Sequence, residues 1–173
     1  MEINQVSSVS HGQLRAWQRR GIDLFYVVYD LLPVRMPHKF PGAEPYFRAW
    51  LDRVGRATGA VCISKATADD LAGWLAQEGP AREVQLDIRW FHLGADVAHS
   101  VPTRGLPTEA STVLARLANQ PTFLMVSTVE PRKGYGQALA AFEALWARGI
   151  EVNLVIVGRT GWLVDELVAR LNQ

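Results

Sequence analysis

Apolar runs and helix-like stripes alternate along this chain, and that alternation most limits the folds open to it. The runs are rich in β-branched and aromatic residues, and most precede apolar residues spaced as on one helix face. The runs cover residues 23–33, 60–64, 84–93, 122–127 and 152–157. The helical stripes are Phe47, Trp50, Leu51 and Val54; Thr67, Leu71, Trp74 and Leu75; Leu139, Phe142 and Trp146; and Val164, Leu167, Val168 and Leu171. Alternation at this spacing predicts an α/β fold with parallel sheets.

The first run, DLFYVVYDLLP at residues 23–33, is apolar almost throughout. Strands of parallel sheets that are buried on both faces have this pattern, so we expect such a strand here. Right-handed connections would bring the carboxyl ends of all strands to one edge of their sheet, where ligands of α/β proteins bind.

A stretch of different composition separates two such series. Residues 97–121 hold three prolines and several Ser, Thr and Gly residues, with one short helical piece near 112–117. We therefore expect a first domain at 1–100, a linker at 101–120 and a second domain at 121–173. The second series stops after two strands and two helices, which leaves a sheet edge and face uncovered. We expect both domains to be incomplete in this chain, or a partner chain to cover them.

Composition excludes several classes of protein. The 173 residues are 49% apolar and 20% charged, with a net charge of +1, so nothing favours binding to nucleic acid. Cys62 is the single cysteine, which rules out an intramolecular disulfide. The polar N-terminus lacks the apolar core of a signal peptide, and we expect a cytoplasmic protein. Arg15, Trp17, Arg19 and Arg20 form a small basic and aromatic cluster, for which peripheral contact with the inner membrane face is the alternative to a solvated helix face.

The segment FLMVSTVEPRKGYG at 123–136 carries the clearest chemical signal. An apolar run ends at Glu130, and the adjacent cations Arg132 and Lys133 follow where a helix is about to begin. Backbone N–H groups at a helix start are unpaired and the helix dipole is positive there, so cations at this place are unfavourable unless an anion is bound. Gly134 allows close backbone approach. The segment therefore predicts a phosphate or diphosphate site, with a solvated loop as the alternative.

Five segments in the same order along the chain resemble the family 4 retaining glycosyltransferases, which have the GT-B fold of two Rossmann-like domains. The resemblance covers nearly the whole chain from about residue 23 onward. The segments are 127–134 (STVEPRKG), 28–33 with Pro37 and 40–41 (VYDLLP, P, FP), 62–67 with 70–71 (CISKAT, DL), 91–96 (FHLGAD) and 155–158 with 161–162 (VIVG, GW).

The resemblance implies transfer of a sugar from a nucleotide-diphosphate donor to a glycan or lipid-linked acceptor, with retention and without a metal or another cofactor. Mannose is the donor sugar that we favour. Arg132 and Lys133 match the residues that hold the donor diphosphate. Glu130 matches the motif as a residue that orients the loop, with a structural ion pair to Arg132 as the alternative, and Gly134 is a further supporting residue.

The chain departs from the family pattern in ways that limit the expectation. Tyr29 stands where many relatives have His, and a phenol binds a sugar hydroxyl but shuttles protons poorly at neutral pH. Tyr29 and Asp30 are therefore only supporting candidates, and no catalytic residue is assigned. The family's amino-terminal glycine-rich loop and its later pair of glutamates have no counterpart in the 173 residues. The chain thus resembles the middle of a glycosyltransferase: the last part of the acceptor domain, the linker and the first part of the donor domain.

Two other functions stay open at this point. The first alternative to an active transferase is that the chain has no activity. It would then be a truncated, inactive fragment or a non-enzymatic nucleotide-binding module. A sugar-nucleotide epimerase of the GT-B fold is the second alternative, although the E-P-R-K segment favours the transferase.

The remaining reactive residue types show no catalytic pattern. His11, His38, His92 and His99 lack metal-ligand spacing, so no metal site is predicted. We expect His92 to be a core histidine and Cys62 a buried apolar residue. Trp50, Trp74 and Trp146 lie at helical spacing and are predicted to be core residues.

Overall fold

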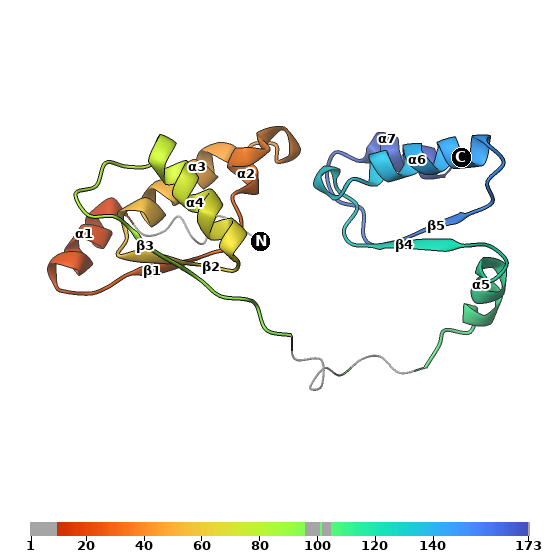
Figure 1. The fold of residues 1–173 in the computed structure, drawn as a ribbon, viewed down its shortest axis with the longest axis horizontal. Coiled ribbons are helices and arrows are strands. Elements are labelled where there is room, and N and C mark those ends of the chain that lie inside the picture. Colours follow the sequence, from red (N-terminus) through yellow and green to blue (C-terminus); the bar gives the residue numbers. More distant parts are fainter. Residues whose placement is uncertain (1–9, 96–100, 102–104, 173) are drawn as a thin grey trace. The chain divides into compact units, whose positions relative to one another are not determined.

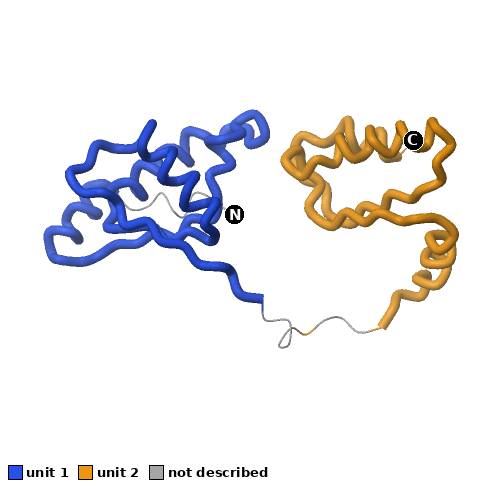
Figure 2. The backbone as a smooth tube through the Cα atoms, in the orientation of Figure 1, with its two compact units in different colours: residues 1–100 blue, residues 101–173 orange. Residues whose placement is uncertain are grey.

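A computed structural model describes residues 10–95, 101 and 105–172 and shows an α/β chain whose strands all pair in parallel. The predicted α/β class with parallel sheets is confirmed. The chain divides into two compact units, Met1–Ser100 and Val101–Gln173 (Figure 2). The assignment of these units to an acceptor side and a donor side stays a prediction. Residues 96–100 and 102–104, at the predicted domain boundary and linker, lie outside the described residues.

Unit 1 contains a three-stranded sheet in the order β1-β2-β3. Phe25 pairs with Gly59 and Gly59 with Asp87, so the three strands start level and end at the same edge. Helices α2, α3 and α4 lie on one side of this sheet (Figure 1), as right-handed connections between neighbouring parallel strands require. The elements are α1 (His11–Arg19), β1 (Phe25–Val28), α2 (Leu32–Arg35), η2 (Pro37–Lys39), α3 (Glu44–Arg56), β2 (Gly59–Cys62), α4 (Lys65–Glu78) and β3 (Asp87–Trp90).

Side-chain caps explain where two of these helices begin. Ser10 and Gln13 form a reciprocal capping box at the start of α1. Ser64 Oγ accepts a hydrogen bond from Thr67 N at 3.1 Å and so fixes the turn from β2 into α4.

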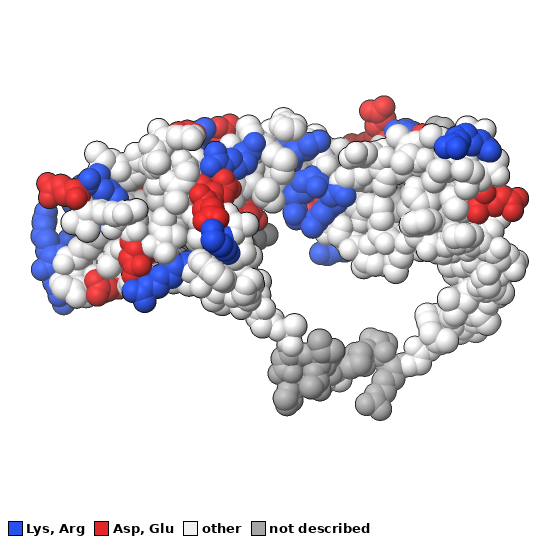
Figure 3. All heavy atoms as spheres, in the orientation of Figure 1, with Lys and Arg blue, Asp and Glu red and all other residues white. Residues whose placement is uncertain are grey.

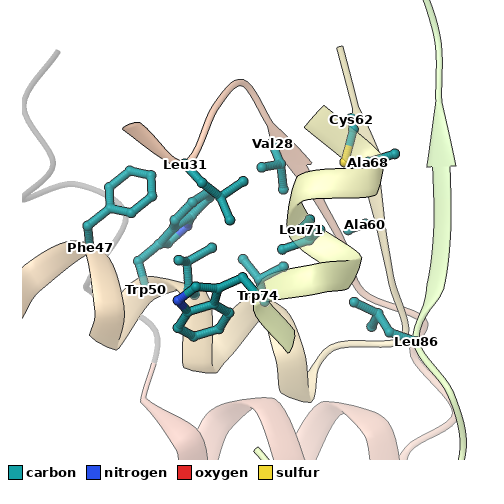
Figure 4. Packing of buried hydrophobic residues seen from close by; sticks show 12 residues of the cluster. Val28, Leu31, Phe47, Trp50, Ala60, Cys62, Ala68, Leu71, Trp74 and Leu86 are labelled. Carbon is teal, nitrogen blue, oxygen red and sulfur yellow. The ribbon is translucent and has the colours of Figure 1, made fainter. Parts of the chain in front are cut away.

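The core of unit 1 lies between the sheet and helices α3 and α4 (Figure 4). Val28, Ala60 and Cys62 of the sheet lie beside Ala68 and Leu71 of α4. Full burial of a side chain such as Leu71, which is 0% exposed, stabilises the fold by roughly 1.5–3 kcal/mol relative to an exposed position. The predictions that Cys62, Trp50 and Trp74 are buried are confirmed.

The expectation that the first strand is buried on both faces is wrong. Phe25 and Val27 are 49% and 50% exposed, because α2, α3 and α4 cover only the opposite side of the sheet. The run at 23–33 also contains more than a strand. Asp30 Oδ1 accepts a hydrogen bond from Leu32 N at 3.0 Å, which ends the extended segment and starts α2.

Unit 2 contains a two-stranded parallel sheet of β4 and β5, with α6 and α7 on one side of it (Figure 1). Its small core consists of Val129, Tyr135 and Val164 with partly buried neighbours from both strands and α7. Leu124, Val126 and Val157 on the other side of the sheet are 62%, 67% and 51% exposed. The elements are α5 (Ala110–Leu117), β4 (Thr122–Val126), η3 (Pro131–Lys133), α6 (Tyr135–Ala147), β5 (Asn153–Val157) and α7 (Asp165–Leu171).

The prediction that Trp146 is a core residue is wrong. It is 42% exposed, and its indole N–H donates to Val152 O at 2.8 Å. The ring packs against Phe142 in the last turns of α6, with ring centroids 5.7 Å apart. The helical stripe was correct, but the two-stranded sheet is too small to cover its last member.

Replacing Leu71 with Ala should lower the free energy of unfolding of unit 1 by about 2–5 kcal/mol, because a fully buried side chain leaves a cavity. Urea unfolding followed by tryptophan fluorescence would measure this loss, since Trp50 and Trp74 lie in the same core. Val84→Ala is the control, because Val84 is 74% exposed and its truncation should change stability by less than about 0.5 kcal/mol. Equal losses in the two variants would contradict the packing described above.

Candidate functional site

The predicted anion-binding residues lie in one tight turn between β4 and α6. The chain leaves β4 after Val126 and passes through the short η3 turn that contains Arg132 and Lys133. Gly134 follows with φ of 75°, the left-handed conformation that favours glycine, and forms the N-cap of α6. Arg132 and Lys133 thus stand where the carboxyl end of a strand meets the amino end of a helix.

The start of α6 is open to a ligand. The helix has 13 residues, its N-cap makes no side-chain hydrogen bond, and its first turn holds no acidic residue. Nothing lies within 4 Å of the place where a Cβ on Gly134 or Gly136 would be. The first backbone N–H groups of a helix have no partner within the helix, so this end offers unpaired donors and a positive dipole.

The charged residues of the turn are arranged unequally. Arg132 Nη2 lies 2.5 Å from Glu130 Oε1, and the Arg132 side chain is 30% exposed while that of Glu130 is 2% exposed. Lys133 is exposed, and no acidic side chain in the described parts of the chain forms an ion pair with it. The turn therefore presents one arginine with a fixed acidic neighbour and one lysine with none.

A second loop, after β5, holds the turn in place. Val129 N donates to Arg159 O at 2.8 Å, and Gly161 N donates to Val129 O at 2.8 Å. A Cβ on Gly158 would lie 1.8 Å from Ser127 O, so only glycine permits this approach. Backbone hydrogen bonds therefore pair the two loops at the carboxyl edge of the sheet, and we call residues 127–129 and 157–161 the paired loops.

Tyr135 is a residue of this region that the sequence analysis missed. It is 1% exposed, and its hydroxyl donates to Ser127 O at 3.0 Å and lies 2.9 Å from Ser127 Oγ. It thereby ties the first residue of α6 to the end of β4. Its position four residues before Leu139 extends the apolar stripe of the helix, and that spacing is the signal that would have identified it.

Charge gathers at this end of unit 2. Figure 3 shows Lys and Arg atoms over the end of the unit that carries the turn between β4 and α6. Arg132, Lys133 and Arg159 are all exposed, the first two in the η3 turn and Arg159 in the paired loops. The local excess of positive charge favours a ligand with more than one negative charge.

The other two predicted residues, Tyr29 and Asp30, lie at the carboxyl end of β1 in unit 1. Tyr29 is 51% exposed, and its carbonyl accepts a hydrogen bond from Thr67 Oγ1 at 3.3 Å. The Asp30 carboxylate bonds to Leu32 N and so has a local role at the start of α2. Their part in binding stays a prediction.

The histidines do not form a metal site among residues 10–95, 101 and 105–172, where no group of three potential ligands occurs. His11 Nε2 lies 3.0 Å from Asp52 Oδ2. The expectation that His92 is a core residue is wrong, because β3 ends at Trp90 and His92 is exposed beside that ring. His99 lies outside the described residues.

Burial raises the pKa of the Cys62 thiol, which opposes formation of a nucleophilic thiolate.

The basic and aromatic cluster lies on α1 and the residue that follows it. Arg15, Arg19 and Arg20 are exposed and Trp17 is half-buried. No helix within the described ranges has the length and apolar character needed to cross a membrane. Contact of this cluster with a membrane surface stays a prediction.

A pocket of about 540 Å³ lies beside α1, far along the chain from the η3 turn. Arg56 and Arg82 are among its lining residues. Arg56 binds the Asp52 carboxylate with two hydrogen bonds, and Arg82 Nη1 donates to Ala57 O at 2.9 Å. These guanidinium groups are already occupied in holding the end of α3, so we place the candidate site at the η3 turn instead.

Comparison with known proteins gives one consistent result. Three curated proteins from Escherichia coli, each named serotype-specific mannosyltransferase WbdA, are similar to this chain. One is 40% identical over 163 residues, which is 92% of this chain and 20% of that protein. Another is 40% identical over 167 residues, or 92% of this chain and 19% of that protein. The chain therefore spans about a fifth of the length of the relatives it matches.

No family model matches the chain, and no solved structure matches it significantly. The similarity to proteins named as mannosyltransferases agrees with the resemblance to glycosyltransferases seen in the five sequence segments.

Gly158→Ala should destabilise the paired loops by roughly 1–3 kcal/mol, because the new methyl group would overlap Ser127 O. Gly136→Ala is the matched control, since nothing lies near its Cβ position and alanine favours a helix by about 0.5–1 kcal/mol. Hydrogen–deuterium exchange of residues 122–161 would report both changes. Faster exchange in the first variant and unchanged or slower exchange in the second is expected; similar behaviour of both would contradict the close approach.

Proposed function

We propose that this chain is part of a glycosyltransferase that transfers mannose from a nucleotide-diphosphate donor to a glycan or lipid-linked acceptor, with retention at the anomeric carbon. The observation that carries the proposal is the 40% identity, over 92% of the chain, to proteins named as mannosyltransferases. The geometry of the η3 turn supports the donor side of this proposal independently of any name.

The turn suits a diphosphate for three physical reasons. The guanidinium of Arg132 can donate two parallel hydrogen bonds to phosphate oxygens, and the ammonium of Lys133 supplies a mobile point charge. The unpaired N–H groups at the start of α6 add fixed donors and the positive end of the helix dipole. Gly134 and Gly136 leave room for the anion to approach the backbone.

The same groups can serve the reaction as well as binding. Transfer breaks the bond between the anomeric carbon and the diphosphate oxygen, whose bonding electrons stay with the diphosphate. The carbon bonds to the oxygen of an acceptor hydroxyl, and the proton of that hydroxyl passes to the released diphosphate or to water. Negative charge grows on the departing diphosphate as the first bond breaks. Arg132 and the start of α6 stabilise that charge from fixed positions, and Lys133 adds a mobile charge. Stabilisation that grows as the bond breaks lowers the barrier more than it strengthens ground-state binding. These residues need no metal ion for this task.

Replacing Arg132 or Lys133 with Gln should weaken binding of a nucleoside diphosphate by roughly 10- to 100-fold each, because each change removes one charged hydrogen-bond donor. Isothermal titration of the 173-residue chain with a panel of nucleoside diphosphates and their mannose conjugates would measure this. Arg148→Gln is the control, since Arg148 is an exposed arginine at the other end of α6. Absence of binding by the unaltered chain, or equal affinity in all variants, would overturn the diphosphate role.

A further inference from the structure

Glu130 is the one buried charged side chain in the described parts of the chain, at 2% exposed. Burying a carboxylate without partners is strongly unfavourable, and such groups are normally paired and hydrogen-bonded. Its place directly before Pro131 and Arg132 therefore needs a physical explanation.

Arg132 forms an ion pair with the Glu130 carboxylate. Arg132 Nη2 lies 2.5 Å from Glu130 Oε1. No group within the described ranges makes a well-aligned hydrogen bond to that oxygen. The Arg132 guanidinium is therefore the charged group that compensates the buried Oε1, and moving Arg132 away would remove that compensation.

Backbone hydrogen bonds fix the main chain at and beside Glu130. Glu130 O accepts a hydrogen bond from Lys133 N at 3.0 Å, and its neighbour Val129 is bonded on both sides to the loop after β5. A Cβ on Gly161 would lie 3.2 Å from the Glu130 Cβ, so that loop covers the base of the glutamate closely. Glu130 is therefore held in place, and its carboxylate is a fixed partner for the Arg132 guanidinium.

We propose that Glu130 is a positioning residue, which holds the Arg132 guanidinium beside the start of α6 in the orientation that receives the diphosphate. Arg carries five N–H donors, so contact with Glu130 through Nη2 leaves donors for an anion. Ordering a long side chain before the ligand arrives removes part of the entropic cost of binding. The inference rests on the proposed diphosphate role of Arg132.

Simple electrostatics predicts the opposite effect of Glu130. A negative charge near an anion site repels the anion, so neutralising it should tighten binding. Positioning predicts that neutralising it weakens binding, because the guanidinium is then free to leave its place. The sign of the change consequently separates the two roles.

The test is titration of the 173-residue chain with inorganic pyrophosphate and with nucleoside diphosphates. E130Q should weaken binding roughly 3- to 10-fold, the range set by one freed long side chain. E130D keeps the charge and should recover part of the lost affinity. E143Q is the matched control, because Glu143 is an exposed glutamate of α6 that is paired with Arg170 at 2.6 Å. It should bind as the unaltered chain does.

A double-mutant cycle distinguishes positioning from a general loss of structure. If Glu130 acts through Arg132, E130Q should have no further effect in a chain that already carries R132Q. Unchanged or tighter binding by E130Q, or an equal loss in the R132Q background, would overturn the inference. If E130Q does not fold, the same comparison is made with E130D. This variant should bind more weakly than the unaltered chain, and it should have no further effect in the R132Q background.

The outcomes also separate this inference from the proposed function. Absence of binding by the unaltered chain, or equal binding by R132Q, would count against the diphosphate site itself. Weaker binding by R132Q together with normal binding by E130Q would overturn only the role of Glu130.

Discussion

Backbone pairing that continues beyond the ends of β4 and β5 is the constraint on which the candidate site depends. Ser127 N and Val129 N donate to Val157 O and Arg159 O, so the two loops follow each other past the strands. This is possible because Gly158 and Gly161 have no side chain where the opposite backbone passes. The same pairing brings the Gly161 loop close to Glu130 Cβ and so contributes to the burial of that residue.

Much of the fold could be predicted from the sequence because local signals were strong. The 3.6-residue stripes located α3, α4, α6 and α7, and the β-branched runs located the five strands of the described residues. The strand limits were harder to predict. The segment at 23–33 is apolar almost throughout and so predicts one strand, whereas the Asp30 carboxylate accepts a hydrogen bond from Leu32 N and α2 begins within the segment. The hydrogen bond of one side chain, Asp30, is a weak signal inside an apolar run.

The candidate site was predictable in part for the same reason. Two adjacent cations before a helix stand out, because an unoccupied helix start disfavours them. The sequence does not reveal the close approach of Gly158 to Ser127, because the two residues are distant in the sequence. The spacing of Tyr135 to Leu139 is a local signal of burial, but not of its hydrogen bond to Ser127 O. Trp146 and His92 show the reverse case. The helical spacing of Trp146 and the place of His92 in an apolar run predict burial. Burial requires enough neighbouring structure, and neither short sheet extends far enough to cover these two residues.

The open sides of the two sheets have a consequence for how this chain behaves in solution. Phe25 and Val27 in one unit, and Leu124, Val126 and Val157 in the other, leave apolar strand surface in contact with water. A net charge of +1 gives little mutual repulsion between molecules. Burial of apolar surface becomes less favourable on cooling and more favourable in sulfate or phosphate salts. Dilute, cold and low-salt solutions are therefore the conditions in which these molecules stay apart.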